Sequence, residues 1–264
     1  MTFERTSPQV FFGTSALLFV ASAALTTVWC DSMSALGEMT MPGGWTMSMA
    51  WMPMPGQSWW GAAASFVGMW IVMMVAMMLP SLVPTLWRYR GAVGRAGEMR
   101  LNWLTALVGI GYFFVWAVCG VAVFPMGAAL VEIEMQQPAL ARVVPIAVGV
   151  VVVIAGALQF SAWKAHHLAS CREAPGRGGI LSADAGAAWR HGLRLGLHCT
   201  YGCAGITAIL LVIGVMDLRV MVLVTTAITA ERIAANGERV ARAIGIVMVG
   251  IGLLLISRAA AGLG

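Results

Sequence analysis

The amino-acid sequence predicts an all-α protein, a polytopic bundle of transmembrane helices, from three observations. Of its 264 residues, 60% are hydrophobic and only 10% are charged, whereas a soluble domain carries about 25% charged residues. The mean hydropathy is +0.86. Apolar runs of about 20 residues, long enough to cross a bilayer, recur along the whole chain. We therefore expect a single integral membrane domain over residues 1–264.

Seven apolar segments are predicted to cross the membrane. They lie near residues 10–29, 63–86, 102–126, 143–163, 194–214, 218–235 and 242–258. The last two are the hardest to delimit, because Asp217 and Arg219 leave only a tight turn before 218–235. Six spans would result if two of these segments formed a re-entrant pair.

The cations are distributed unevenly between the two sides that these spans define. With the N-terminus inside, only Arg142, Arg219 and Arg258 of the 16 Lys and Arg residues lie outside. The positive-inside rule then places the N-terminus in the cytoplasm of a bacterial cell, with the chain in the inner membrane. The net charge of +5 is thus a sign of topology, and a nucleic-acid partner is not indicated.

Residues 30–62 form a methionine-rich segment that this topology makes extracytoplasmic. It holds seven methionines: Met33, Met39, Met41, Met47, Met49, Met52 and Met54. Thioether sulfur is soft and uncharged, so such a cluster favours Cu(I) over other metals. Pro-Gly pairs break any long helix here, and Trp59-Trp60 suits the outer interface. We expect a loop or short surface helix over the bundle.

The segment 63–86 presents two pairs of methionines at helical spacing. Met73 and Met77 are four residues apart, as are Met74 and Met78. Residues at this spacing share one face of a helix, so each pair could offer two sulfurs to one ion. The alternative is that these methionines only fill gaps in apolar packing.

A pair of cysteines marks the segment 194–214. Cys199 and Cys203 are also four residues apart, and His198 lies one residue off their shared face. Two thiols can hold Cu(I) linearly, or Zn(II) if further ligands join. The alternative is that both are small, buried apolar residues. Cys30 and Cys119 have no partner in sequence and are predicted to be structural.

Three more residues complete the predicted metal site. A carboxylate such as Glu231 costs on the order of 3 kcal/mol at mid-membrane and is usually functional there, although it could instead snorkel or pair with an arginine. Its depth, counted along the helices, matches that of the thiols and of Met77 and Met78 in the inner half of the membrane. His167 and Cys171, four residues apart, could form a cytoplasmic port, or else face solvent in a loop.

Several of these stretches together resemble a bacterial family catalogued as a domain of unknown function and described as predicted metal-binding integral membrane proteins. The resemblance covers roughly residues 60–256, and the matching stretches are 74–81, 163–172, 192–203, 214–218, 231–232 and 245–252. It implies metal binding. This chain has His167 and Gly202 where the family tends to have additional cysteines.

The chain also resembles eukaryotic high-affinity copper transporters in the separate elements that carry its soft ligands. Those proteins combine an external Met-rich segment, a membrane Met-x-x-x-Met and cytoplasmic Cys or His residues. This chain has all three elements with the same predicted sidedness.

The leading hypothesis is an inner-membrane protein for Cu(I) transport or delivery, served by a periplasmic metallochaperone or by other membrane subunits. External methionines would collect the ion, Met73, Met77 and Met78 would pass it to the two thiols, and His167 with Cys171 would release it. One alternative is a copper-dependent membrane redox enzyme or its subunit. Another is a purely structural helical subunit of a larger complex. No catalytic residues are predicted.

Overall fold

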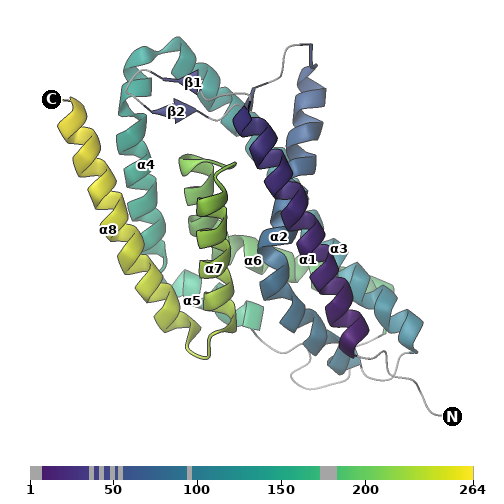
Figure 1. The fold of residues 1–264 in the computed structure, drawn as a ribbon. Helices are drawn as coiled ribbons and strands as arrows, with labels where there is room; N and C mark the ends of the chain where they lie inside the picture. The colour runs from purple at the N-terminus through teal and green to yellow at the C-terminus, as the bar shows by residue number, and fades with distance from the viewer. Residues whose placement is uncertain are drawn as a thin grey trace.

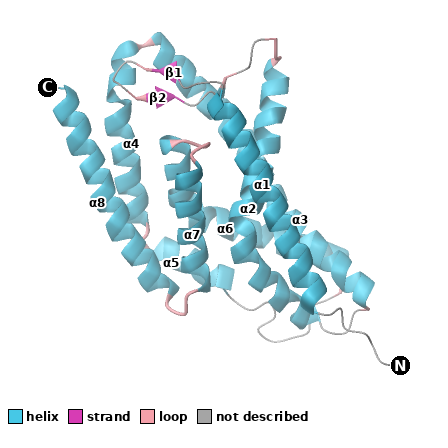
Figure 2. Ribbon diagram, in the orientation of Figure 1, coloured by secondary structure: helices cyan, strands magenta, loops and turns pink. Residues whose placement is uncertain are grey.

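The computed structural model describes residues 8–35, 39–41, 45–47, 51–52, 56–93, 97–172 and 183–263. The helices are α1 (Pro8–Ala35), α2 (Trp59–Val93), α3 (Glu98–Gln136), α4 (Pro138–Leu158), α5 (Ala162–Arg172), α6 (Ala185–Ile213), α7 (Leu218–Ile233) and α8 (Gly237–Leu263). Two strands of two residues each, β1 (Met39–Thr40) and β2 (Thr46–Met47), pair antiparallel. The predicted all-α bundle is confirmed (Figure 2).

Six of these helices are long and apolar enough to cross a membrane: α1, α2, α3, α4, α6 and α8. The predicted span 218–235 corresponds to α7, which has only 16 residues. In Figure 1 the chain runs up and down in alternation, with α7 descending between α6 and α8, so the N- and C-terminal ends lie at opposite ends of the bundle. Six of the seven predicted spans thus correspond to helices long and apolar enough to cross a membrane, and the seventh corresponds to the short α7.

Two predicted boundaries need correction. Residues 127–141, expected to be extramembrane, are almost entirely helical, because α3 continues to Gln136 and α4 begins at Pro138. Proline at the first position of a helix is favourable, since the missing N–H would have had no partner there. α4 also ends at Leu158 rather than at 163, and α5 follows after a short turn.

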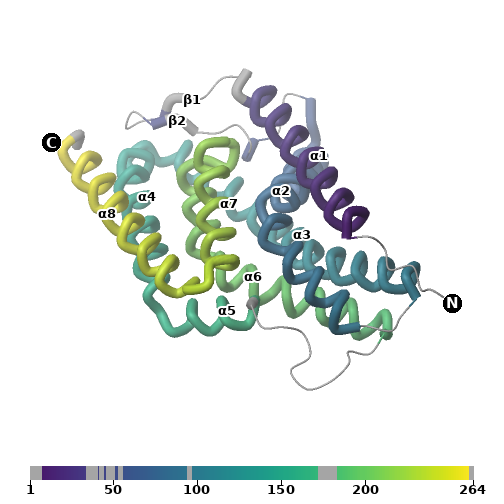
Figure 3. The backbone as a smooth tube through the Cα atoms, turned by 60° about the horizontal axis from the view of Figure 1, so that its bottom comes forward, coloured from purple at the N-terminus to yellow at the C-terminus, as the bar shows by residue number. Residues whose placement is uncertain are grey.

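Helix α2 occupies the centre of the molecule. It is the most buried of the six long helices, and α1 is the least buried. α1 packs along α2, with the ring of Phe11 5.4 Å from that of Trp87. α7 lies between the α1–α2 pair and the α4–α8 pair (Figures 1 and 3). The side chains of α2 thus meet neighbours from several helices, which is where a buried site can form.

Glycines permit two close helix contacts, as expected for membrane helices. A Cβ atom at Gly192 of α6 would lie 2.4 Å from the backbone oxygen of Val108 on α3. On α8, a Cβ at Gly245 or Gly252 would lie 2.9 Å or less from atoms of α4 and the turn after it, whereas Gly250 faces open space. The close approach of α8 to α4 therefore depends on Gly245 and Gly252, and Gly250 takes no part in it.

The turn between α6 and α7 is defined by two residues. Gly214 ends α6 with a φ of 155°, a conformation that favours glycine. Asp217 caps α7, its carboxylate accepting hydrogen bonds from the backbone N–H groups of Arg219 and Val220 at 2.8 and 3.2 Å. Such caps satisfy N–H groups that have no partner within the helix. This tight turn allows α7 to return into the bundle.

The described part of the methionine-rich segment between α1 and α2 contains the paired strands β1 and β2. Met41 is buried against Val131 and Ala141, and the indole of Trp45 donates a hydrogen bond to the Ala141 carbonyl at 2.9 Å. These contacts hold the described part of the segment over the α3–α4 turn. It lies at the same end of the bundle as the C-terminus, opposite α5 (Figure 1).

Candidate metal site

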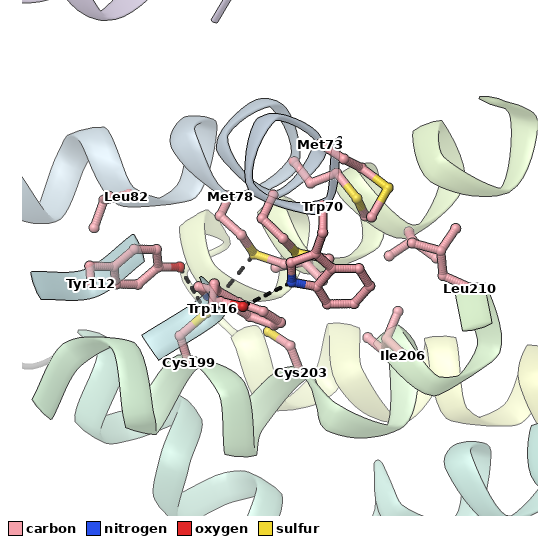
Figure 4. Packing of buried hydrophobic residues seen from close by; sticks show 14 of the residues in the cluster. Trp70, Met73, Met78, Leu82, Tyr112, Trp116, Cys199, Cys203, Ile206 and Leu210 are labelled. Atoms are coloured by element: carbon pink, nitrogen blue, oxygen red, sulfur yellow. Dashed lines mark hydrogen bonds between the residues drawn. The ribbon is translucent and has the colours of Figure 1, made fainter. Parts of the chain in front are cut away.

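The four predicted methionines of α2 all point into the protein interior. Met73, Met74, Met77 and Met78 are each at most 3% exposed. Figure 4 shows that Met78 extends toward α6 whereas Met73 lies farther along the core. The four side chains therefore line a length of the core, and Met78 is the one with a described contact to a thiol.

Cys199 is the centre of the sulfur cluster. Its Sγ lies 3.9 Å from the Sδ of Met78 and 2.8 Å from the phenolic oxygen of Tyr112. Cys203, one turn farther along α6, interacts with Cys199 and is also buried. Both thiols rise from α6 toward α2 (Figure 4). The sequence-predicted residues Met78, Cys199 and Cys203 are thus brought together.

The glycines of α6 determine where Tyr112 lies. A Cβ on Gly196 would lie 2.9 Å from the Tyr112 backbone oxygen, so α3 can approach α6 this closely only because glycine is present. Tyr112 is fully buried and directs its hydroxyl at Cys199. A phenol donating to sulfur favours the thiolate over the thiol. The close helix contact therefore creates a polar contact beside the metal-ligand candidate.

Arg232 places a positive charge beside the thiols. Its guanidinium donates to the hydroxyl of Ser81 at 3.1 Å and to the Sγ of Cys171 at 3.3 Å. It also interacts electrostatically with Cys199 and Cys203. Two thiolates with one Cu(I) carry a net charge of −1, and this guanidinium would offset it. Such compensation matters because an uncompensated charge is costly in the interior.

Glu231 is held by α5 and the turn before it. Its Oε2 accepts a hydrogen bond from the Lys164 ammonium at 2.6 Å, and its Oε1 accepts one from the Gln159 amide at 2.8 Å. Lys164 also donates to the Gly202 carbonyl at 2.6 Å, between the two cysteines of α6. All three polar side chains are buried. Both carboxylate oxygens thus have partners, and the ion pair ties α5 and α7 to the turn of α6 that carries the thiols.

His167 and His198 meet at the contact of α5 with α6. Their Nδ1 atoms are 3.0 Å apart, and the ring of His167 also lies 4.8 Å from that of Trp163. His166 is close but exposed. Burial, the neighbouring His198 and His166 together lower the pKa of His167. A neutral imidazole has a nitrogen lone pair for a metal, so this pair is a second group of donors.

Cys171 is buried on α5, but its described contact is Arg232 rather than His167. Burial raises the pKa of its thiol, and the adjacent Arg232 acts in the opposite direction. Cys171 also lies within electrostatic range of Cys199 and Cys203. The structure therefore associates Cys171 with the core thiols and His167 with His198.

The external methionines are only partly described. Met47 lies in β2, opposite Met39 in β1. Met52 is partly buried and packs against the buried cluster that contains Met41. The predicted ligands Met49 and Met54 lie outside the described residues. The described part of this segment is a small folded cap in which Met41 is buried.

Sequence reasoning missed the polar residues that surround the sulfur atoms. Tyr112, Arg232 and Gln159 were not assigned to the site, and Lys164 was counted only as an inner cation. Tyr112 is one of just three tyrosines and lies within an apolar run. A hydroxyl in such a run needs a hydrogen-bond partner, and this could have pointed to Tyr112 as part of a site. Arg232 directly follows Glu231, so its position in the membrane could have been read together with that of the carboxylate.

The donors that converge are two thiols and one thioether. Among the described residues, no three His, Cys, Asp or Glu side chains form a group able to hold a metal ion. The cluster therefore depends on methionine sulfur for its third donor. Soft, low-coordinate donor sets of this kind suit Cu(I), whereas Mg²⁺ and Ca²⁺ require several oxygen ligands.

Comparisons with known proteins identify the family. Residues 67–255 match the family model described as PpoB2, copper chaperone. Curated proteins and solved structures gave no match. The matched range includes the α2 methionines, α5, the α6 thiols and α7, and so contains the whole sulfur cluster. Because the match spans well over half of the chain, this protein belongs to the PpoB2 copper chaperone family.

Proposed function

We propose that the protein binds Cu(I) inside a bacterial inner membrane at Met78, Cys199 and Cys203 and delivers it across or within that membrane. The observation that carries this proposal is the buried contact of the Cys199 thiol with the Met78 thioether at 3.9 Å. Two helices that are far apart in sequence place soft donors against each other. Copper handling by the family supports the choice of metal.

The polar neighbours suit a site that accepts and releases its ion. Binding of Cu(I) by the two thiols releases their protons, as for any thiolate ligand. The hydrogen bond from Tyr112 and the charge of Arg232 stabilise the resulting anionic centre. A thioether is a weak, neutral ligand, so Met78 can exchange while the thiolates keep hold of the metal. Delivery requires binding that is neither too weak nor too strong.

A direction follows from the positive-inside rule, which puts α5 on the cytoplasmic side. The α2 methionines precede the thiols from the outer side, and Cys171 with the His167–His198 pair follows them toward the inner side. Cys171 is close enough to the thiols to interact electrostatically with them. We therefore assign Cys171 as the first acceptor beyond Cys203, with the imidazoles next.

The test is copper analysis of purified protein loaded with Cu(I) under anaerobic conditions. The variant Cys199→Ala/Cys203→Ala should retain less copper than wild type. The matched control is Cys119→Ala, since Cys119 is a half-buried thiol of another membrane helix, α3. Equal copper in the double variant and the control would refute the site.

Transport and redox roles are separated by a second measurement. In proteoliposomes, wild type should move Cu(I) or pass it to an acceptor chelator without any change in oxidation state. A stoichiometric redox turnover of the bound copper would instead support a membrane redox enzyme. Absence of copper in wild type would support a structural subunit.

A further inference from the structure

A second thiol–thioether contact lies at the other end of the bundle. The Sγ of Cys30, near the end of α1, is 3.9 Å from the Sδ of Met216 in the α6–α7 turn. The two residues are 186 positions apart in the chain. Cys30 is 2% exposed, and Met216 is partly buried. The contact has the same chemistry and the same length as the one between Cys199 and Met78.

Each residue of this pair is followed in sequence by an aspartate, Asp31 and Asp217. Asp31 and Asp217 both lie within electrostatic range of the Cys30 thiol. Asp31 is exposed, so the cluster has negative charge on its solvent side. Such charge attracts a cation.

The packing of α1 on α2 places Cys30 level with Met69. The two helices run in opposite directions in Figure 1, and Phe11 meets Trp87 near one end. Cys30 lies 19 residues beyond Phe11, and Met69 lies 18 residues before Trp87. Met69 is buried on α2. Cys30 and Met69 therefore occupy the same level of the bundle.

The packing of α7 on α2 gives the same level independently. These helices run in the same direction in Figure 1, and Arg232 donates to Ser81 at 3.1 Å. Met216 precedes Arg232 by 16 residues, and Ser65 precedes Ser81 by the same number. The Cys30–Met216 contact is thus within about one helical turn of Met69.

A column of methionines leads from this level to the core thiols. Met69, Met73 and Met77 follow one another at four-residue spacing, and all three are buried. Met78 is nine residues beyond Met69, a rise of about 14 Å. Residues four apart on a helix have Cβ atoms about 5–6 Å from each other, so the long, flexible methionine side chains could pass an ion from one sulfur to the next.

We propose that Cys30 and Met216 form a second, separate Cu(I) site, which loads the ion at the end bearing the β strands and passes it along the α2 methionines. The identity of the acceptor at Cys199 rests on the proposed function. Copper stays in the +1 state throughout. The Cys30 thiol releases its proton to solvent as the copper–sulfur bond forms and regains one when the ion leaves.

The test is anaerobic Cu(I) titration of the full chain in detergent against a chromophoric Cu(I) chelator. Cys30→Ser should bind one copper fewer than wild type. Met216→Leu keeps the size and apolarity of the side chain but lacks sulfur, so it should weaken the same site while the circular dichroism spectrum is unchanged. Cys119→Ser is the matched control and should bind as wild type does.

Combination with Cys199→Ser/Cys203→Ser separates the two proposals. If both sites exist, that variant loses one copper, and adding Cys30→Ser removes another. If Cys30→Ser and Met216→Leu match the control while the core variant loses copper, the second site is refuted and the proposed function stands. If only Cys30→Ser and Met216→Leu lose copper, the core site is refuted instead. Wild type without copper overturns both.

Discussion

Replacement of Lys164 by methionine should destabilise the fold strongly. The Lys164 ammonium lies 2.6 Å from Glu231 Oε2 and 2.6 Å from the Gly202 carbonyl, and the paired side chains are only 5% and 2% exposed. Methionine preserves the apolar stem but removes the charge, leaving Glu231 as a buried carboxylate without its counter-ion. Breaking such a pair by removing one partner costs about 3–5 kcal/mol.

The measurement is denaturant unfolding of the purified protein in detergent, followed by the fluorescence of its 11 tryptophans. Arg242→Met is the matched control, because it breaks the exposed pair with Glu238, whose atoms are 3.7 Å apart and whose side chains are 63% and 60% exposed. Exposed pairs contribute about 0–1 kcal/mol. Lys164→Met/Glu231→Gln should recover part of the loss. A cost of Lys164→Met no larger than that of the control would contradict a stabilising role for the buried ion pair.

Three further perturbations test other parts of the structure. Tyr112→Phe removes the hydrogen bond to Cys199 and should weaken Cu(I) binding about ten- to a hundred-fold in chelator competition; unchanged affinity would contradict a role in tuning the ligand. Gly192→Ala should lower the free energy of unfolding by about 1–3 kcal/mol, because the added Cβ would lie 2.4 Å from a backbone oxygen of α3. Gly250→Ala is the control and should not destabilise the protein, because no atom lies within contact of its added Cβ. The pKa of His167 is lowered in the folded protein, which favours its neutral form. The neutral imidazole therefore contributes stability above the ordinary histidine pKa of about 6.5, and this contribution is lost as pH falls through the folded pKa. An NMR titration of His167 with a midpoint at or above the ordinary pKa would contradict this expectation.

The helices were predictable because lipid requires long apolar runs whose backbone hydrogen bonds are satisfied internally. The four-residue spacing of cysteines and methionines also identified the side chains that line the core. Counting depth along the helices correctly suggested that Met78 and Cys199 could meet, and the structure brings them into contact.

Contacts between distant segments were not predictable. Lys164 and Glu231 are 67 residues apart, and their pairing depends on which helices are neighbours. Tyr112 reaches Cys199 only because glycines bring α3 and α6 together. Cys30 was predicted to be structural because its partner, Met216, is not near it in sequence. A single sequence indicates the period of a helix but not the helix against which it packs.

The shortness of α7 has a consequence for the surrounding membrane. Its 16 residues span about 24 Å at 1.5 Å per residue, less than the roughly 30 Å of a bilayer's hydrocarbon core. Under the proposed membrane placement, a helix this short is accommodated by local thinning of the bilayer, by snorkelling side chains or by association with neighbouring helices. Arg232 lies at the terminus of α7 beside Cys171. We expect thinning there to bring headgroups and water toward that thiol, which would shorten the distance between the buried sulfur cluster and an acceptor at the membrane surface.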